Sequence, residues 1–340
     1  MRSVSRLLRA SVLSAALSLS PSHARAQPAA YFQGRTITIF VTNPPGGGFD
    51  LTARVLARHL GDHVPGHPTV IVANMPGAHG ITGANYIFNI APRDGTALGA
   101  VVPYLPQYQV QGVAGLQYDA PRFTWIGSVG DVHELLYVWH TVPVRSVFDL
   151  RNHETILATA GPVETFARLL SATVGARFKL VKGYAGTQET HLALERGEVE
   201  AALSSYSVLR AYWPEWVAHN KVRMIVRNGF ERDPELPDVP ATVELAGTPA
   251  DRAVLAFFAG STAIGRAYVA PPDLRAEVRA ILRAGFDATM RDPGFVAESR
   301  NAKLDVVPLT GDDLDRVVAG MMNVDAATRD RIRDIVGNEL

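Results

Sequence analysis

The sequence predicts an α/β fold of two lobes, each a mainly parallel sheet flanked by helices. Short apolar runs typical of strands alternate with amphipathic helical patterns in two βαβαβ sets, one on each side of about residue 124. Turns rich in glycine and proline follow several of these runs. The chain has 340 residues, a length that favours two hydrophobic cores over one.

The first 26 residues have the pattern of an export signal. Arg2, Arg6 and Arg9 form a basic start, an apolar run follows over 7–19, and Ala24-Arg25-Ala26 is a small-x-small cleavage site. The apolar run is too short for a comfortable membrane span. We therefore expect cleavage after Ala26 and a soluble periplasmic product.

The charge balance and the cysteine count exclude several classes of function. Removing the four arginines of the signal from the 33 basic residues leaves 29 against 33 acidic ones, a net charge of −4. No basic tract remains to suggest a nucleic acid or an anionic membrane as partner. The chain has no cysteine, which excludes disulfides and thiol chemistry.

The first βα unit contains the most informative stretch of the chain. A strand over 36–41 runs into Pro44-Pro45-Gly46-Gly47-Gly48-Phe49-Asp50, and a helical pattern follows from Leu51. The glycines allow a close backbone approach to a ligand, and Asp50 suits the positive end of the helix. Such a unit can bind an anion through its free N–H groups, or it can be a tight turn without a ligand. These residues alone leave both readings open.

A second turn of similar composition follows the next strand. The strand at 69–73 ends in Asn74-Met75-Pro76-Gly77-Ala78-His79-Gly80, a helix is expected over 81–90, and a third strand over 97–102. Because ligands of parallel α/β sheets lie at the carboxyl ends of strands, both turns are expected at the same binding edge.

The rest of the chain continues the alternation of strands and helices. A connector is expected at 232–240, followed by a strand at 254–258 and a helix over 273–290 capped by Asp273. A last long helix opens at Gly311, with a short one at the C-terminus. The second βαβαβ set comprises strands at 123–129, 135–139, 155–159, 177–181 and 199–204, and helices at 146–150, 163–174 and 188–196.

Four other chemistries fit this sequence less well. The spacing of His59, His63 and His67 resembles a metal-binding helix face, but glycines and prolines interrupt that helix, so exposed histidines are favoured. His133-Glu134 lacks the second histidine of a zinc protease, and 127–130 lacks the first glycine of a nucleophile elbow. The glycine triplet also lacks the spacing of a dinucleotide fingerprint.

Aromatic residues cluster in the second half of the predicted second lobe. Such clusters more often form core than line a site, although these side chains could also wall a cleft between lobes. The four residues are Tyr206, Tyr212, Trp213 and Trp216.

With these motifs in hand, the chain resembles the extracytoplasmic solute-binding receptors of tripartite tricarboxylate transporters, the Bug-type receptors. The resemblance is strongest over 37–99, where the two glycine-rich turns and Pro92-Arg93-Asp94-Gly95-Thr96 occur in the family's order. Lys182-Gly183 followed by 194–200 resembles a second-domain signature, as do 236–242 and 268–272 for the segments after it. Each motif alone is modestly specific, and the ordered set is specific.

The resemblance implies a two-lobed periplasmic-binding-protein fold of the second type, with the ligand held between the lobes. One lobe would comprise 35–123 and 237–340, and the other 124–236. In the family, backbone N–H groups and hydroxyls from a loop of each lobe hold a ligand carboxylate. Carried over, the first-lobe contacts are Pro45, Gly46, Gly47, Gly48, Phe49, Asp50, Asn74, Gly77 and Ala78. The second-lobe contacts are Gly161, Glu164, Thr165, Gly183, Tyr184, Gly186 and Thr187, with Tyr206 beside them.

The implied function is capture of a small organic carboxylate for the membrane permease of a tripartite transporter. The resemblance implies no cofactor, no metal and no enzymatic activity, and a monomer is expected. This chain departs from the family pattern around 151–162. An acidic Glu164 at the cleft would disfavour a second carboxylate there, which makes tricarboxylates such as citrate doubtful. Presentation of the ligand to a sensor kinase and, less favoured, an exported enzyme using the same cleft are the alternatives.

Overall fold

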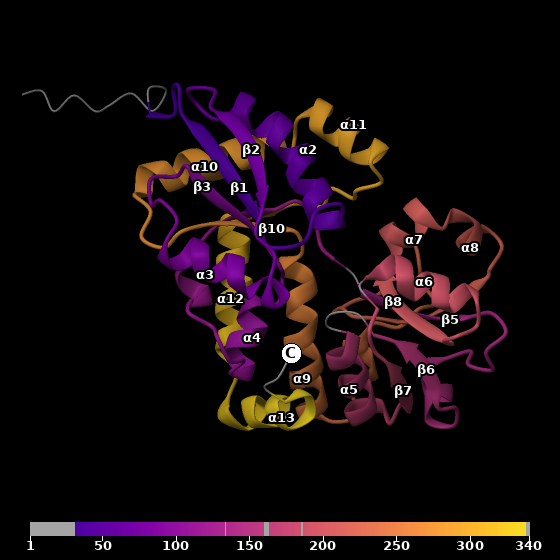
Figure 1. Ribbon diagram of the computed structural model, residues 1–340. Helices are drawn as coiled ribbons and strands as arrows, with labels where there is room; N and C mark the ends of the chain where they lie inside the picture. The colour runs from indigo at the N-terminus through magenta and orange to yellow at the C-terminus, as the bar shows by residue number, and fades with distance from the viewer. Residues whose placement is uncertain (1–30, 133, 160–162, 185, 338–340) are drawn as a thin grey trace, which may run out of the picture.

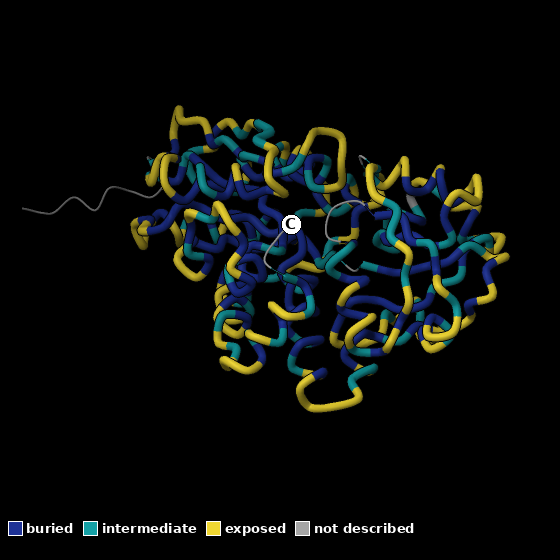
Figure 2. The backbone as a smooth tube through the Cα atoms, turned by 60° about the horizontal axis from the view of Figure 1, so that its bottom comes forward, coloured by how far each residue is buried: buried dark blue, intermediate teal, exposed yellow. Residues whose placement is uncertain are grey.

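The computed structural model describes residues 31–132, 134–159, 163–184 and 186–337, which form two α/β bodies side by side (Figure 1). The first contains the elements from both ends of the described chain, and the second contains the middle. The predicted signal at 1–26 lies outside the described residues. Figure 2 shows buried backbone inside both bodies and exposed backbone at their outer turns. Among the described residues, no helix has the length and apolar character needed to cross a bilayer.

The first body is built on a six-stranded sheet in the order β11-β4-β10-β3-β1-β2. β1 pairs in parallel with β2 and β3, as the βαβαβ pattern predicts, but β10 pairs antiparallel with both β3 and β4. The sheet is therefore parallel at one side and antiparallel at the other. The strands are β1 (Thr36–Val41), β2 (Thr69–Asn74), β3 (Ala97–Val101), β4 (Thr124–Ser128), β10 (Ala267–Ala270) and β11 (Leu309–Thr310).

Helices cover both faces of this sheet because its strands alternate apolar side chains between the two sides. Ile37, Ile39 and Val41 of β1 pack in one buried cluster with α2, α10 and α11. The other face packs against α3, α4, α9 and α12. The helices are α2 (Gly48–His63), α3 (Ile81–Asn89), α4 (Leu105–Gln111), α9 (Pro249–Ile264), α10 (Ala276–Thr289), α11 (Pro293–Asn301), α12 (Gly311–Met322) and α13 (Ala326–Val336), with short 3-10 turns η1 (Ala78–Gly80), η2 (Ala120–Arg122) and η4 (Thr242–Leu245).

The second body is built on a five-stranded sheet in the order β7-β6-β8-β5-β9. β6 is parallel to β7 and β8, whereas β5 is antiparallel to β8 and β9. Two buried clusters lie on its two faces. The elements are β5 (Glu134–Trp139), η3 (Val147–Arg151), β6 (Thr155–Ala158), α5 (Val163–Val174), β7 (Phe178–Val181), α6 (Thr187–Glu195), β8 (Ala201–Ser205), α7 (Tyr206–Tyr212), α8 (Pro214–Ala218) and β9 (Val222–Arg227).

The start of the second lobe differs from the sequence-based boundary at 124. β4 lies in the first sheet between β10 and β11, so the chain enters the second sheet only at β5. The sequence pattern of an apolar strand does not reveal which sheet the strand joins, because its partners β10 and β11 are far away along the chain. We propose that the lobes divide between Ser128 and Glu134, and again after Arg227.

Two further expectations are wrong. The segment 254–258, expected as a strand, lies inside α9, which begins at a Thr248 cap that accepts the Asp251 N–H. α9 is apolar on nearly all sides because it is buried, so its sequence lacks the one-sided pattern of a surface helix. Asp273 does not cap α10, which begins at Ala276. Asp273 has a φ of 62° and its carboxylate pairs instead with Arg93 and Arg122.

The two bodies also touch away from their connections. α13 packs against both α9 and α5 at the lower end of the molecule (Figure 1). Leu169 of α5 is fully buried in the cluster that fills the first body. The helix α5, which carries the predicted contacts Glu164 and Thr165, is thus held against the first body.

Candidate functional site

One edge of the first sheet gathers the two glycine-rich turns. β1, β2 and β3 run in parallel, so the loops after Val41 and Asn74 leave the sheet at the same edge. β10 runs the other way and begins where β3 ends, since Ala267 pairs with Val101. The residues just before β10 therefore lie at the same edge as both loops, as the ligand-binding edge of an α/β sheet requires.

The first loop is open and sits at the N-terminus of a long helix. Residues 44–48 are all exposed, and α2 begins at Gly48 with Gly47 as its cap. Gly46 has a φ of 86°, which favours glycine, whereas Gly47 has an ordinary φ of −87° and an ideal Cβ there would meet nothing within 4 Å. The space beside Gly47 is therefore free for a ligand. Phe49, predicted as a contact, packs against the core cluster beneath the loop.

Asp50 stabilises this loop through hydrogen bonds. Its carboxylate accepts the Gly46 N–H at 2.9 Å, the Arg54 Nε–H at 2.9 Å and the Asn74 Nδ2–H at 2.9 Å. Burial alone would raise the pKa of Asp50, but these hydrogen bonds outweigh it and the pKa lies below the usual value. The ionised carboxylate ties the first loop to the end of β2. Asp50 and Asn74 thus hold the two loops together, and the ligand contacts that the family resemblance implies for them stay predictions.

The second loop is held in a rarely adopted backbone conformation. Gly77, Ala78, His79 and Gly80 all have positive φ values, from 43° to 135°. For Ala78 and His79 this is an unusual state for a residue with a side chain, and such strain concentrates at binding sites. A Cβ at Gly77 would lie 2.7 Å from Thr82 Oγ1, so glycine is required there. Gly77 and Ala78 are exposed at this edge of the sheet, and their predicted contact with a ligand stays a prediction.

The second sheet presents its own loops at one edge. Gly183 and Thr187 lie in the loop from β7 to α6 and are exposed, and Tyr184 and Gly186 are partly exposed. Gly183 has a φ of 106°, and a Cβ at Gly183 or Gly186 would meet nothing within 4 Å. Thr187 is the first residue of α6, beside Gly186 as its cap. Gly161 lies outside the described residues, while Thr165 is partly exposed in the first turn of α5.

Glu164, expected as an acidic group at the cleft, is paired with two cations. Lys182 Nζ lies 2.6 Å from one carboxylate oxygen and Arg168 Nη2 lies 2.7 Å from the other. The hydrogen bonds from Lys182 and Arg168 lower the pKa of Glu164, against burial, which raises it. Because two cations neutralise it, Glu164 gives a weaker argument against a second ligand carboxylate than expected.

Tyr104 and Glu134 form a contact between the two bodies that no sequence motif predicts. The Tyr104 hydroxyl, at the start of α4, donates to Glu134 Oε1 at 2.5 Å, and Glu134 begins β5. The Asn228 Nδ2–H donates to Glu134 Oε2 at 3.5 Å, and the Asn228 backbone N–H donates to the Glu134 carbonyl at 2.8 Å. Burial raises the pKa of Glu134, against the hydrogen bonds from Tyr104 and Asn228. A sequence motif would not reveal this pair, because 30 residues separate its members.

Glu134→Gln is expected to become more stabilising, relative to the parent, as the pH rises. In the folded protein Glu134 stays protonated at pH values above its unfolded pKa of about 4.3, because burial raises its folded pKa. The stability that this protonated group contributes is present at low pH and is lost as the pH rises through the folded pKa. Glutamine keeps an acceptor for Tyr104 and does not ionise. Urea unfolding of both proteins at about pH 5 and about pH 8 tests this, and a pH-independent difference would contradict it.

His59 and His63 on α2 contact acidic residues at the start of and within α11, whereas His67 lies beyond the end of α2 and is exposed. α2 continues through Gly61 to His63, contrary to the expected interruption. His59 contacts Asp292 at 3.2 Å and Glu298 at 2.7 Å, and its side chain is only 18% exposed. The expectation of exposed histidines is therefore wrong for His59. In the part of the chain that the structure describes, no group of three metal-ligating side chains could hold an ion.

The aromatic cluster divides between core and surface. Trp216 is buried and lies with Trp213 around the buried His191, whose pKa falls to about 4 because of burial. Tyr212 is 56% exposed. Tyr206 is partly buried at the end of β8, with the Arg210 guanidinium 4.8 Å from its ring centre. Of the four residues, Tyr206 lies at the carboxyl edge of the second sheet.

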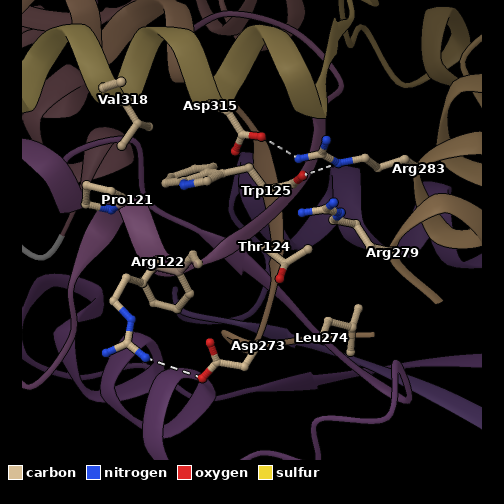
Figure 3. A pocket seen from close by; sticks show the side chains of 12 residues that line it. Pro121, Arg122, Thr124, Trp125, Asp273, Leu274, Arg279, Arg283, Asp315 and Val318 are labelled. Carbon is tan, nitrogen blue, oxygen red and sulfur yellow. Dashed lines mark hydrogen bonds and ion pairs between the residues drawn. The ribbon is translucent and has the colours of Figure 1, made fainter. Parts of the chain in front are cut away.

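Two hollows lie away from these loops. One of about 380 Å³ is lined by β4, α10 and α12, where Arg283 pairs with Asp315 and Arg122 pairs with Asp273 (Figure 3). This hollow includes Thr124 at one end of β4. Ser128, at the other end of β4, pairs with Ala267. The hollow therefore lies at the other edge of the sheet. A second hollow, of about 630 Å³, lies between α5, β7 and α13. Neither is lined by a predicted contact residue.

Comparison with known proteins gives consistent likenesses. No family model matches the chain. A UPF0065 protein from the tcbD-tcbE intergenic region of Pseudomonas sp. is 27% identical over 250 residues, which cover 69% of this chain and 70% of the relative.

Solved structures match over most of their length. A TctC solute-binding protein from Polaromonas has a TM-score of 0.67 at 19% identity, covering 88% of this chain and 99% of that one. MatC from Rhodopseudomonas palustris with bound malate has a TM-score of 0.63 at 21% identity, covering 90% and 100%. A further R. palustris protein with adipate has a TM-score of 0.65 at 20% identity, covering 90% and 99%.

The two sheets, their flanking helices and these neighbours define the class of the protein, a two-lobed periplasmic-binding-protein fold of the second type. The predicted resemblance is confirmed as a likeness, since the chain is similar to curated UPF0065 proteins, the Bug family, and to the solved structures of a TctC solute-binding protein and of the periplasmic binding protein BugD.

Proposed function

We propose that this protein is an extracytoplasmic solute-binding receptor that captures a small mono- or dicarboxylate and delivers it to a tripartite tricarboxylate-type permease. The observation that carries the proposal is the open loop 44–48, at the N-terminus of the 16-residue helix α2, with free space beside Gly47. Helix N-termini with exposed glycine amides favour anions. The Bug-type likeness supports the receptor role.

The ligands bound by structural neighbours favour carboxylates over other anions. The similar proteins from R. palustris carry malate and adipate. The proposal uses a turn of each lobe, as the family resemblance implies, so the second-lobe turn at 183–187 would close on the group held by the first. We further propose a periplasmic location and a monomer, with no cofactor and no catalytic turnover.

Native mass spectrometry of the freshly purified protein tests the proposal. A receptor should carry a small organic acid in a one-to-one complex, released on denaturation. Proton NMR of that acid after prolonged incubation with the protein should show it unchanged. Conversion of the acid would point to an enzyme, while its transfer to a purified kinase sensor domain, but not to the permease, would favour a sensory role.

Thr187→Val is expected to weaken carboxylate binding by about 1–3 kcal/mol, the usual effect of losing a hydrogen bond to a charged group. The Thr187 side chain is exposed at the start of α6, so valine should leave folding unchanged. Isothermal titration calorimetry measures the loss. Thr173→Val is a suitable control, because the Thr173 hydroxyl donates to Leu169 within α5. Unchanged affinity in the Thr187 variant would confine the site to the first lobe.

A further inference from the structure

Arg266 is a buried arginine beside the glycine loop. It directly precedes β10, and its side chain lies at the carboxyl edge of β1 and β3. Only 6% of the residue is exposed. An ideal Cβ on Gly48 would lie 3.9 Å from Arg266 Nη2, so the guanidinium approaches the first residue of α2. A charged group is thus enclosed where both glycine-rich turns leave the sheet.

One side of this guanidinium lacks a hydrogen-bond acceptor. Nη1 donates to the Asp131 carbonyl at 3.3 Å, whereas Nε is buried and has no partner within the described part of the chain. No hydrogen bond from Nη2 to a described residue is found either. The Nε–H and Nη2–H of an arginine point the same way and together match the two oxygens of a carboxylate. The edge without a partner therefore has the geometry of a carboxylate receptor.

The electrostatics of this place call for an anion. A guanidinium and the positive end of a 16-residue helix lie close together, and they repel each other unless negative charge lies between them. Asp50, in the first turn of α2, is already engaged by Arg54. The charges of Asp305 and Asp131 attract Arg266, yet burial dominates and lowers its pKa. A buried cation whose N–H groups lack acceptors destabilises the folded protein unless a ligand supplies those acceptors.

We infer that Arg266 and the N–H groups at the start of α2 together hold one carboxylate of the ligand, with the Nε–Nη2 edge donating to its two oxygens. The inference rests on the proposed receptor function and adds to it the residue that recognises the charge. It makes an ionised carboxylate a requirement for binding. It also predicts that amides and esters of the same acids are rejected, since they would leave the guanidinium uncompensated.

The test compares Arg266→Gln, Arg266→Lys and Arg266→Met with the parent by calorimetry against malate, succinate, adipate and benzoate. The best of these probes is expected to bind Arg266→Gln about a hundredfold more weakly, as for a truncated buried charge pair. Lysine, which cannot bind bidentately, should give an intermediate loss. Arg279→Gln is the matched control, because Arg279 lines the hollow at the other edge of the sheet (Figure 3), and it should bind like the parent.

Melting of the ligand-free proteins separates recognition from a structural role. Without ligand, Arg266→Met should melt at the same temperature as the parent or higher, because an uncompensated buried charge is replaced by an apolar side chain. Parent-like affinity in Arg266→Gln would overturn the inference and leave the receptor function standing. A lower melting temperature for ligand-free Arg266→Met would overturn it as well. If no probe binds the parent protein, both the inference and the carboxylate proposal fail.

Discussion

Gly47→Val is expected to reduce carboxylate affinity by at least about a hundredfold, or about 2.8 kcal/mol, without weakening the fold. Gly47 has φ −87° and ψ 175°, a conformation that valine adopts readily. The added side chain meets nothing within the protein, since a Cβ there has no neighbour within 4 Å. It would instead fill the space in which the account places the ligand carboxylate. Calorimetry and thermal melting on the same preparation measure the two effects.

The same substitution at Gly320 is the control for Gly47→Val. Gly320 is exposed on α12, and a Cβ there also meets nothing within 4 Å. Gly320→Val should retain parent affinity, with a change in stability within about 0.5 kcal/mol. Gly186→Val places the corresponding obstacle in the second-lobe turn, where a loss of binding is also expected. Full affinity in Gly47→Val would show that the ligand does not use this loop.

Gly265→Ala should destabilise the protein by about 3 kcal/mol or more, and it should weaken binding at the same time. Gly265 has a φ of 56°, and a Cβ there would lie 2.1 Å from the Gly130 carbonyl oxygen and 2.7 Å from Asp131 Cα. Gly130 and Asp131 belong to the segment between β4 and β5, and Gly265 belongs to the segment between α9 and β10. Forcing these two segments apart would shift Arg266 and the junction between the lobes. Urea unfolding measures the stability, and calorimetry the binding.

Gly115→Ala separates backbone strain from the steric clash. Gly115 also has a positive φ, 82°, but a Cβ there meets nothing within 4 Å. Its alanine variant should lose only about 1 kcal/mol, through the strained φ alone. If Gly265→Ala costs no more than Gly115→Ala, the two connecting segments are not in the close contact that this account requires.

The local features of the first βα units were predictable from the sequence. Strand, glycine-rich turn and helix follow one another over short stretches, so the composition of 36–60 is enough to place the loop at the helix N-terminus. The parallel order of β1, β2 and β3 then follows from the connecting helices. The loop residues Gly46, Gly47 and Gly48 were found in this way.

Contacts between distant strands were not predictable. β10 inserts between β3 and β4 from more than 130 residues away, and it brings Arg266 to the binding edge. A single arginine beside a strand carries no signal of such a role. For Asp50, the family resemblance implies a ligand contact, because the whole loop 45–50 is carried over as one unit. Only its three partners show that it holds the loop.

The expected strand at 254–258 failed for a related reason. A buried helix and a buried strand share an unbroken apolar run, and periodicity cannot separate them when all sides are covered. The charge environment of Glu164 could not be predicted from the sequence either. Lys182 is remote from it in sequence, and their contact forms only in the folded protein.

The central claim is that an ionised carboxylate is bound between the loops of the two lobes. The most direct measurement is a calorimetric titration of the parent protein with acids from succinate to adipate, malate and aromatic monocarboxylates, each beside its uncharged amide. We predict saturable one-to-one binding of at least one acid and no binding of its amide. Binding of a sugar, a cation or the amides, with no response to any carboxylate, would contradict the account.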